Sequence, residues 1–172
     1  MLMLLDKNSL SGVRLTTQLI QNCMAVQERP LTADELADLR DFQAAGNEGV
    51  AVVTDRDTPS AIVEAIGAVS SGLGELEQEA RVQASVGLGA LWGEQVHRAL
   101  GWEWVMLSWG KPDDEIFALV SPDRAFYISP VYLLLPYATG ARSEDTSVLL
   151  FNMLLDGSGL PRSKPHRYRE LS

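Results

Sequence analysis

The chain has 172 residues, and its 14 Lys and Arg against 23 Asp and Glu give a formal net charge of −9. That length suits one ordinary domain, and 46% hydrophobic with 22% charged residues can build a sizeable core, which excludes disordered and collagen-like chains. The single cysteine excludes a secreted disulfide framework, while the acidic balance disfavours nucleic acid and anionic membranes and favours a basic protein as partner.

The first residues are apolar, from Met1 to Leu5, but Asp6 follows at once and no basic stretch precedes them. This run is too short for a secretory signal, and no window reaches the roughly 18 apolar residues of a membrane-spanning helix. We therefore expect a cytoplasmic protein without a membrane segment, with Cys23 in a reducing compartment.

Helical patterns account for most of the first hundred residues. We expect one helix over residues 10–27, and a second that begins at the capping-box pair Thr32 and Glu35 and ends at Gly46. The segment Thr58-Pro59 offers an N-cap and a first-turn proline for a third helix.

The longest helix is expected over residues 73–100, with Gly101 as its terminator. Several glycines lie inside it, and each costs a helix up to about 1 kcal/mol relative to alanine. We expect another element to approach the backbone closely at these glycines, with a break in the helix near the first of them as the alternative. They are Gly87, Gly89 and Gly93.

After this helix the apolar pattern changes to that of strands. Three short runs, 102–109, 115–121 and 125–129, are separated by turn-forming residues. They predict an antiparallel three-stranded meander.

Two helices are expected after the meander. One begins at Ser129-Pro130 and reaches about Tyr137, and the other is capped by Ser143 and ends at Gly157. The predicted fold is α+β, with N-terminal helices and the long helix packed on a small antiparallel three-stranded meander, followed by C-terminal helices. It forms a single globular domain over residues 1–160.

Residues 161–172 carry the opposite charge to the rest of the chain. Four cations against one carboxylate give 4 − 1 = +3, and two prolines with few apolar residues accompany them. We expect a basic and mobile tail, or one that docks on the acidic body. The charged residues are Arg162, Lys164, Arg167, Arg169 and Glu170.

The meander lacks a polar face. In its first strand Trp102, Trp104 and Met106 share one side, and Val105 and Leu107 share the other. A sheet with one side in water should alternate apolar and polar residues, so we expect both faces to be covered. The long helix should cover one face, and the last helix of this chain or a second protein should cover the other.

All four tryptophans fall within residues 92–109, where they either build the core or form a binding patch of the kind found at interface hot spots. The acidic loop after them could steer a cationic partner, or it could be a solvated turn. The predicted partner-binding residues are Glu103, Trp104, Trp109, Asp113, Asp114 and Glu115.

Two patterns could support catalysis or metal binding. Glu94 and His97 resemble half of a di-iron ligand set, but Glu94 can instead pair with Arg98 one helical turn on. Asp55 and Asp57 could form an acid/base or metal pair, although no histidine is obliged to meet them. We therefore expect no catalytic residue, no metal and no cofactor.

Four segments resemble a family of small bacterial domains of unknown function. The family pairs a glycine-bearing helix with a Gly-x-x-Trp strand, a hairpin and an Ile/Val-x-Pro turn before a closing helix. The segments that carry the resemblance are Leu88–Gln95, Leu100–Val105, Phe117–Pro122 and Tyr127–Pro130. Such domains recur among bacterial immunity proteins, so the resemblance implies neutralisation of a toxin.

The sequence thus predicts a non-catalytic binding protein, a bacterial immunity protein that neutralises a cognate secreted toxin through an acidic surface bearing tryptophan. The alternatives are an acidic chaperone for a secreted effector and a small hydrolase built on Asp55, Asp57 or Glu94. Either a monomer or a homodimer is compatible with the sequence.

Overall fold

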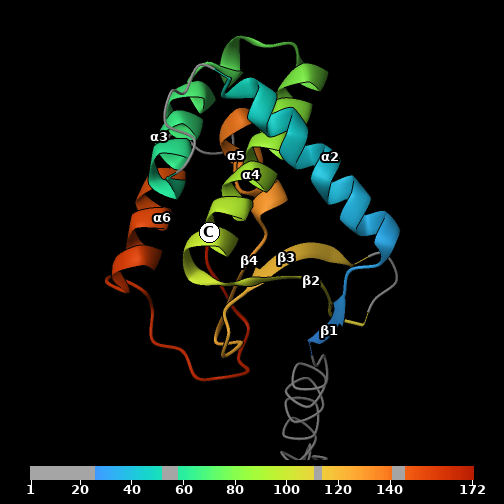
Figure 1. The fold of residues 1–172 in the computed structure, drawn as a ribbon, viewed down its shortest axis with the longest axis vertical. Coiled ribbons are helices and arrows are strands. Elements are labelled where there is room, and N and C mark those ends of the chain that lie inside the picture. The colour runs from blue at the N-terminus through green and yellow to red at the C-terminus, as the bar shows by residue number, and fades with distance from the viewer. Residues whose placement is uncertain (1–25, 52–57, 111–113, 141–145) are drawn as a thin grey trace, which may run out of the picture.

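The computed structural model describes residues 26–51, 58–110, 114–140 and 146–172. The fold is α+β, with helices gathered on one side of a small sheet (Figure 1). The α-helices are α2 (Ala33–Gly49), α3 (Pro59–Ser70), α4 (Gln78–Leu100), α5 (Leu135–Ala138) and α6 (Ser147–Asp156), and the 3₁₀ helices are η1 (Leu73–Glu75) and η2 (Pro130–Tyr132). Residues 1–25, which include most of the first predicted helix, lie outside the described ranges.

The sheet contains the three predicted strands, but it is larger than predicted. The strands are β1 (Gln27–Pro30), β2 (Glu103–Ser108), β3 (Ile116–Val120), β4 (Phe126–Ile128) and β5 (Arg169–Glu170), in the order β1-β2-β3-β4-β5. Neighbours are antiparallel except β4 and β5, which are parallel, so the sheet is mixed. The three-stranded description is therefore corrected to five strands. The two edge strands were missed because both are short and polar, without the apolar alternation that marks a strand.

Residues 161–172 join this sheet through β5, and the expectation of a mobile tail gives way to its docked alternative. The backbone N–H groups of Tyr168, Arg169 and Leu171 donate to carbonyls of Arg124, Ala125 and Tyr127, each at 3.0 Å. Leu171 is 7% exposed and belongs to the main core. One buried leucine and a ladder of backbone hydrogen bonds hold the segment, and composition alone shows neither.

Helix α2 begins as predicted and ends later. The Thr32 hydroxyl accepts from the Glu35 N–H at 3.3 Å, and the Glu35 carboxylate accepts from the Thr32 N–H at 2.8 Å, which completes the capping box. The helix continues through Gly46 to Gly49. Gly46 therefore does not end the helix. It allows α2 to approach α4 closely, since a Cβ there would lie 2.2 Å from the carbonyl oxygen of Gly87 on α4.

The glycines of α4 mark close approaches, as predicted, and the helix is continuous across them. A Cβ at Gly89 would lie 2.1 Å from the Pro130 carbonyl oxygen, and one at Gly93 would lie 2.6 Å from the Trp104 ring. Gly101, at φ 67°, ends the helix as expected. The helix starts at Gln78 rather than at residue 73, because η1 precedes it.

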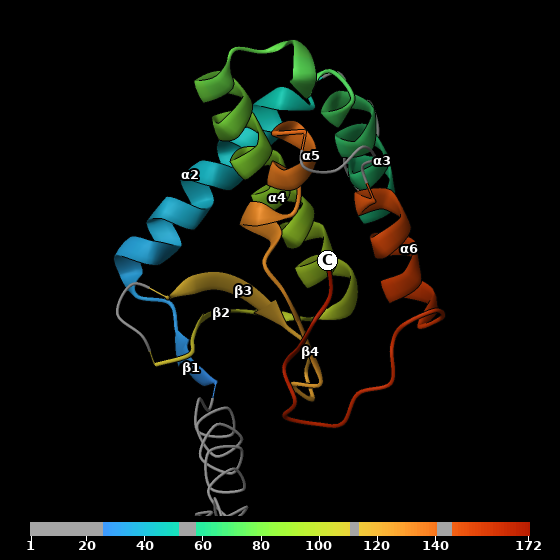
Figure 2. The same ribbon diagram turned by 180° about the vertical axis from the view of Figure 1, so that it is seen from behind.

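The C-terminal helices differ in detail from the prediction. The helix expected from Ser129-Pro130 consists of two short pieces, η2 and α5. The last helix, α6, ends at Gly157, whose φ is 64°, but it is preceded by Thr146, and Ser143 lies outside the described residues. Helix α6 packs beside α3 on the helical side of the sheet (Figure 2).

Candidate functional site

The sheet face turned away from the helices is apolar and buried, and α6 does not pack on it. The residues of this outer face, each at most 7% exposed, are Val105, Leu107, Ala118, Val120 and Tyr127. Their partly buried apolar neighbours in the described ranges are Val26, Trp109, Ile116 and Tyr168. Of the two covers expected for this face, the last helix is wrong, because Leu150, Phe151 and Leu154 carry α6 into the core on the other side. A second protein on this face stays a prediction.

A charged network crosses the outer face and ties its edges together. Arg124, in the left-handed region at φ 56°, donates to Glu28 on β1 at 2.9 Å and to Glu103 on β2. The Tyr168 hydroxyl donates to Glu28 at 2.7 Å. Burial alone would raise the pKa of Glu28, but the hydrogen bonds from Arg124 and Tyr168 outweigh it and hold that pKa below its usual value.

A second charged network lies where β1, β3 and the start of α2 meet. Arg29 donates to Glu35 at 2.7 Å and to Glu115 at 2.7 Å. Hydrogen bonds from Arg29 and from the Thr32 backbone lower the pKa of Glu35 to about 2. The same guanidinium also lowers the pKa of Glu115. Both carboxylates therefore stay ionised well below neutral pH.

The structure divides the predicted partner-binding residues among three places. Glu103 lies on the Arg124 network. The Trp109 ring packs against that of Tyr127 in a tilted arrangement with centroids 5.8 Å apart, and the Trp109 backbone N–H donates to Asp114 at 2.9 Å beside Glu115. Trp104 points to the helices and packs on Gly93, so it serves the core rather than an exposed patch. Asp113 lies outside the described residues.

An acidic ridge on α2 was not singled out from the sequence. Its members are exposed and lie at positions i, i+4, i+7 and i+14, which share one face of a helix: Asp34, Asp38, Asp41 and Glu48. Leu39 and Gly46 bury the opposite side against α4. The charge spacing within α2 was the signal that could have revealed this ridge.

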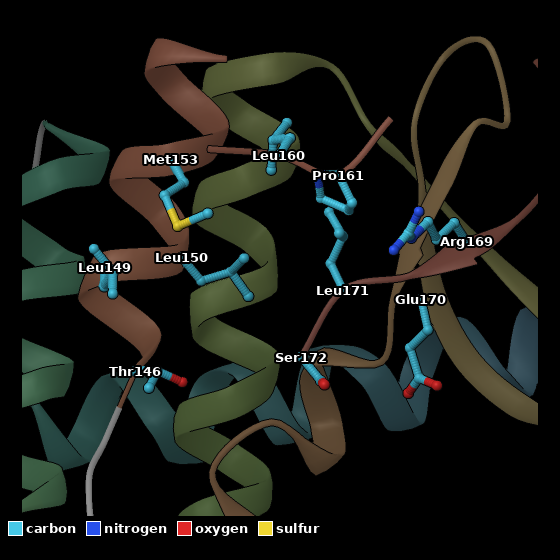
Figure 3. A pocket seen from close by; sticks show the side chains of 10 residues that line it. All are labelled: Thr146, Leu149, Leu150, Met153, Leu160, Pro161, Arg169, Glu170, Leu171 and Ser172. Atoms are coloured by element: carbon cyan, nitrogen blue, oxygen red, sulfur yellow. The ribbon is translucent and has the colours of Figure 1, made fainter. Parts of the chain in front are cut away.

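A groove of about 510 Å³ lies between α6 and the C-terminal segment (Figure 3). Thr146 and Ser172 lie at one end and Leu160 at the other, with α4 behind. The apolar lining residues are Leu149, Leu150, Met153, Leu160, Pro161 and Leu171. Leu149 is 60% exposed, which makes this wall of the groove accessible to a ligand.

A second hollow, of about 610 Å³, lies within the C-terminal segment and adjoins the groove at Arg169, which lines both. Its lining residues are Arg162, Ser163, Lys164, Arg167 and Arg169. The Ser163 hydroxyl donates to the Ala125 carbonyl at 2.9 Å, and Arg169 donates to the Arg162 carbonyl at 3.1 Å. The first bond holds the hollow against the residue before β4, and the second joins two of its walls within the C-terminal segment.

The residues considered for catalysis have structural contacts where they are described. Glu94 accepts a hydrogen bond from Gln43 at 3.2 Å, and His97 Nδ1 lies 2.6 Å from the Trp102 carbonyl oxygen. No three His, Cys, Asp or Glu side chains gather into a metal-binding group in the ranges that the structure covers. Asp55 and Asp57 lie outside those ranges.

None of the described helices combines the length and apolar character needed to cross a membrane. No protein-family model, curated protein or solved structure matches the chain. The resemblance to domains of bacterial immunity proteins therefore stays a prediction.

Proposed function

We propose that the chain is a non-catalytic binding protein, a cytoplasmic bacterial immunity protein that neutralises a cognate secreted toxin by binding it through an acidic surface. The observation that carries the proposal is the continuity of this surface. It runs along the ridge of α2 and continues past Glu35 to Glu115 and Asp114 at the end of the β2–β3 hairpin.

The electrostatics of this acidic surface suit a basic partner. Arg29 is shared by Glu35 and Glu115, so one cation faces two carboxylates at the end of the ridge. The four ridge carboxylates remain exposed. Such a surface accelerates the encounter with a cationic protein and discriminates against anionic ones, and both effects weaken with added salt.

Trp109 supplies an apolar group beside the charges. Its indole is half-buried against Tyr127, and its backbone N–H is held by Asp114. Partly exposed tryptophans of this kind are common at the centre of protein interfaces, where charged groups surround them. The proposed binding surface therefore consists of Trp109, the hairpin end and the α2 ridge.

The experiment begins with the reading frame next to this gene. A secreted protein encoded there would be expressed as its C-terminal domain, with and without this chain, and growth of the host would be measured. We expect restored growth and a one-to-one complex on gel filtration. A stable homodimer that neither protects the cells nor binds the neighbouring product would refute the proposal, as would an unrelated metabolic enzyme in that position.

A further inference from the structure

The C-terminal segment presents a concentration of positive charge that forms no ion pair among the residues that the structure describes. The ion pairs that form among the described residues involve Arg29 and Arg124. None of them reaches the four exposed cations of the hollow, Arg162, Lys164, Arg167 and Arg169. Like charges held this close repel one another, and a bound anion would relieve that repulsion.

The backbone holds these cations in place. His166 and Tyr168 adopt positive φ angles of 59° and 47°, and their N–H groups donate to the Asp123 and Arg124 carbonyls, each at 3.0 Å. The hollow is therefore formed by a segment anchored at both residues on the turn between β3 and β4. Arginine guanidinium groups offer the forked donors that carboxylates and phosphates accept.

The adjoining groove has a different chemistry. It is lined mostly by leucine, methionine and proline side chains, and Figure 3 shows Leu150 and Met153 of α6 on one side with Pro161 and Leu171 on the other. Volumes of a few hundred to about 1,000 Å³, mostly apolar with a few placed polar groups, are typical of small-molecule sites. Arg169 lines both the groove and the hollow, so the apolar recess and the cationic one are neighbours, and Glu170 lines the groove beside Arg169.

The length of the groove favours a small ligand over a protein segment. Its α6 wall runs from Thr146 to Met153, and seven steps of about 1.5 Å each give roughly 10 Å. An extended peptide advances about 3.3 Å per residue, so only about three residues would fit along it. A single flexible apolar chain uses the same length without leaving backbone polar groups against leucine side chains.

We propose that the groove and the hollow together bind one amphipathic anion, with its apolar chain along α6 and its carboxylate or phosphate head against the C-terminal cations. The ligand is a single molecule in solution rather than a lipid bilayer, because the groove is a short recess of about 510 Å³, which takes one small molecule. This site lies on a different face from the acidic surface of α2, so the two proposals can fail independently.

Titration calorimetry on the full chain tests the site with sub-micellar decanoate and decyl phosphate. We expect saturable one-to-one binding that weakens with salt. Acetate and inorganic phosphate, which lack the chain, and decyltrimethylammonium, which carries the wrong charge, should each bind at least about tenfold more weakly, and each tenfold corresponds to about 1.4 kcal/mol. Equal binding of the cationic amphiphile, or none by the two anionic ones, would overturn the proposal.

Matched variants locate the binding. Leu149→Glu places a carboxylate on an exposed wall of the groove, and Leu155→Glu makes the same change on the same helix outside it, at a residue that is 42% exposed. Only Leu149→Glu should weaken decanoate binding.

The combined change of Arg162, Lys164 and Arg167 to Gln tests the cationic hollow and should weaken decanoate binding at least about tenfold, while Arg40→Gln on α2 should not. Equal effects of target and control variants would contradict the assignment, with circular dichroism confirming that each variant folds.

Discussion

Close backbone contacts at glycine join α2, α4 and η2. Gly46 meets Gly87 between the two long helices, and Gly89 meets Pro130 at η2. In each pair a backbone oxygen occupies the position that a Cβ would need, so neither partner can move aside as a flexible side chain would. Glycine lowers the helix propensity of α4, and the close packing that only glycine allows at these positions offsets this loss of stability.

Gly89→Ala tests this contact. The new Cβ would lie 2.1 Å from the Pro130 carbonyl oxygen, so the helix must shift, and we expect a loss of about 1–3 kcal/mol in the free energy of unfolding, typical of overpacking. Urea denaturation measures it. Gly74→Ala is the control, because nothing lies within 4 Å of its added Cβ, and a loss of more than about 0.5 kcal/mol there would contradict the account.

The Arg29 network predicts a dependence of stability on pH. The pKa of Glu35 is lowered to about 2 in the folded protein from 4.5, so the unfolded state binds more protons between these values. The stabilisation is present above about pH 4.5 and is lost as the pH falls towards 2. The melting temperature should therefore fall less between pH 6 and pH 3 in Glu35→Gln than in the wild type. An equal fall in both proteins would show that this pair does not contribute.

Local sequence patterns predicted some of these residues and could not have predicted others. Thr32 and Glu35 form a capping box recognisable within four residues. The Arg124–Glu28 bond joins residues 96 positions apart, and nothing near either residue indicates the other. The contact between Arg29 and Glu115 could not be predicted from nearby residues either, because it depends on the antiparallel pairing of β1, β2 and β3.

At the scale of elements, the sheet is completed by two strands whose sequences do not resemble strands. β1 and β5 flank the apolar strands β2, β3 and β4, which the alternating pattern did predict. Pairing at the two edges is directed by backbone hydrogen bonds, and by one core residue in the case of β5. Two of the partly buried side chains that pack against the apolar outer face, Val26 and Tyr168, lie next to the edge strands.

Leu171→Ala measures how firmly the C-terminal segment is attached. Leu171 is 7% exposed in the main core, so its truncation should cost about 2–5 kcal/mol of unfolding free energy. Leu155→Ala removes the same atoms from a side chain that is 42% exposed and should cost much less. Chemical denaturation of both variants gives the comparison, and equal losses would indicate that β5 is not docked in solution.

At the scale of the molecule, charge is separated between two regions. The acidic ridge follows α2 on one side, and the cationic segment after α6 lies on the other in both views (Figures 1 and 2). A net charge of −9 therefore describes neither region by itself. The composition predicted a basic partner, but the helix that carries the ridge emerged only when its exposed and buried faces were known.

The most direct test of the binding account measures the association rate of the neighbour-encoded domain with two charge-reversed variants. One changes Asp34, Asp38 and Asp41 of the ridge to Lys, and the other changes the exposed Glu75, Glu77 and Glu79 before and at the start of α4. Both shift the net charge equally. We predict that the ridge variant associates at least about tenfold more slowly at low salt, since local steering contributes factors of this size, while the other retains most of its rate. Equal rates for the two variants would contradict the central claim.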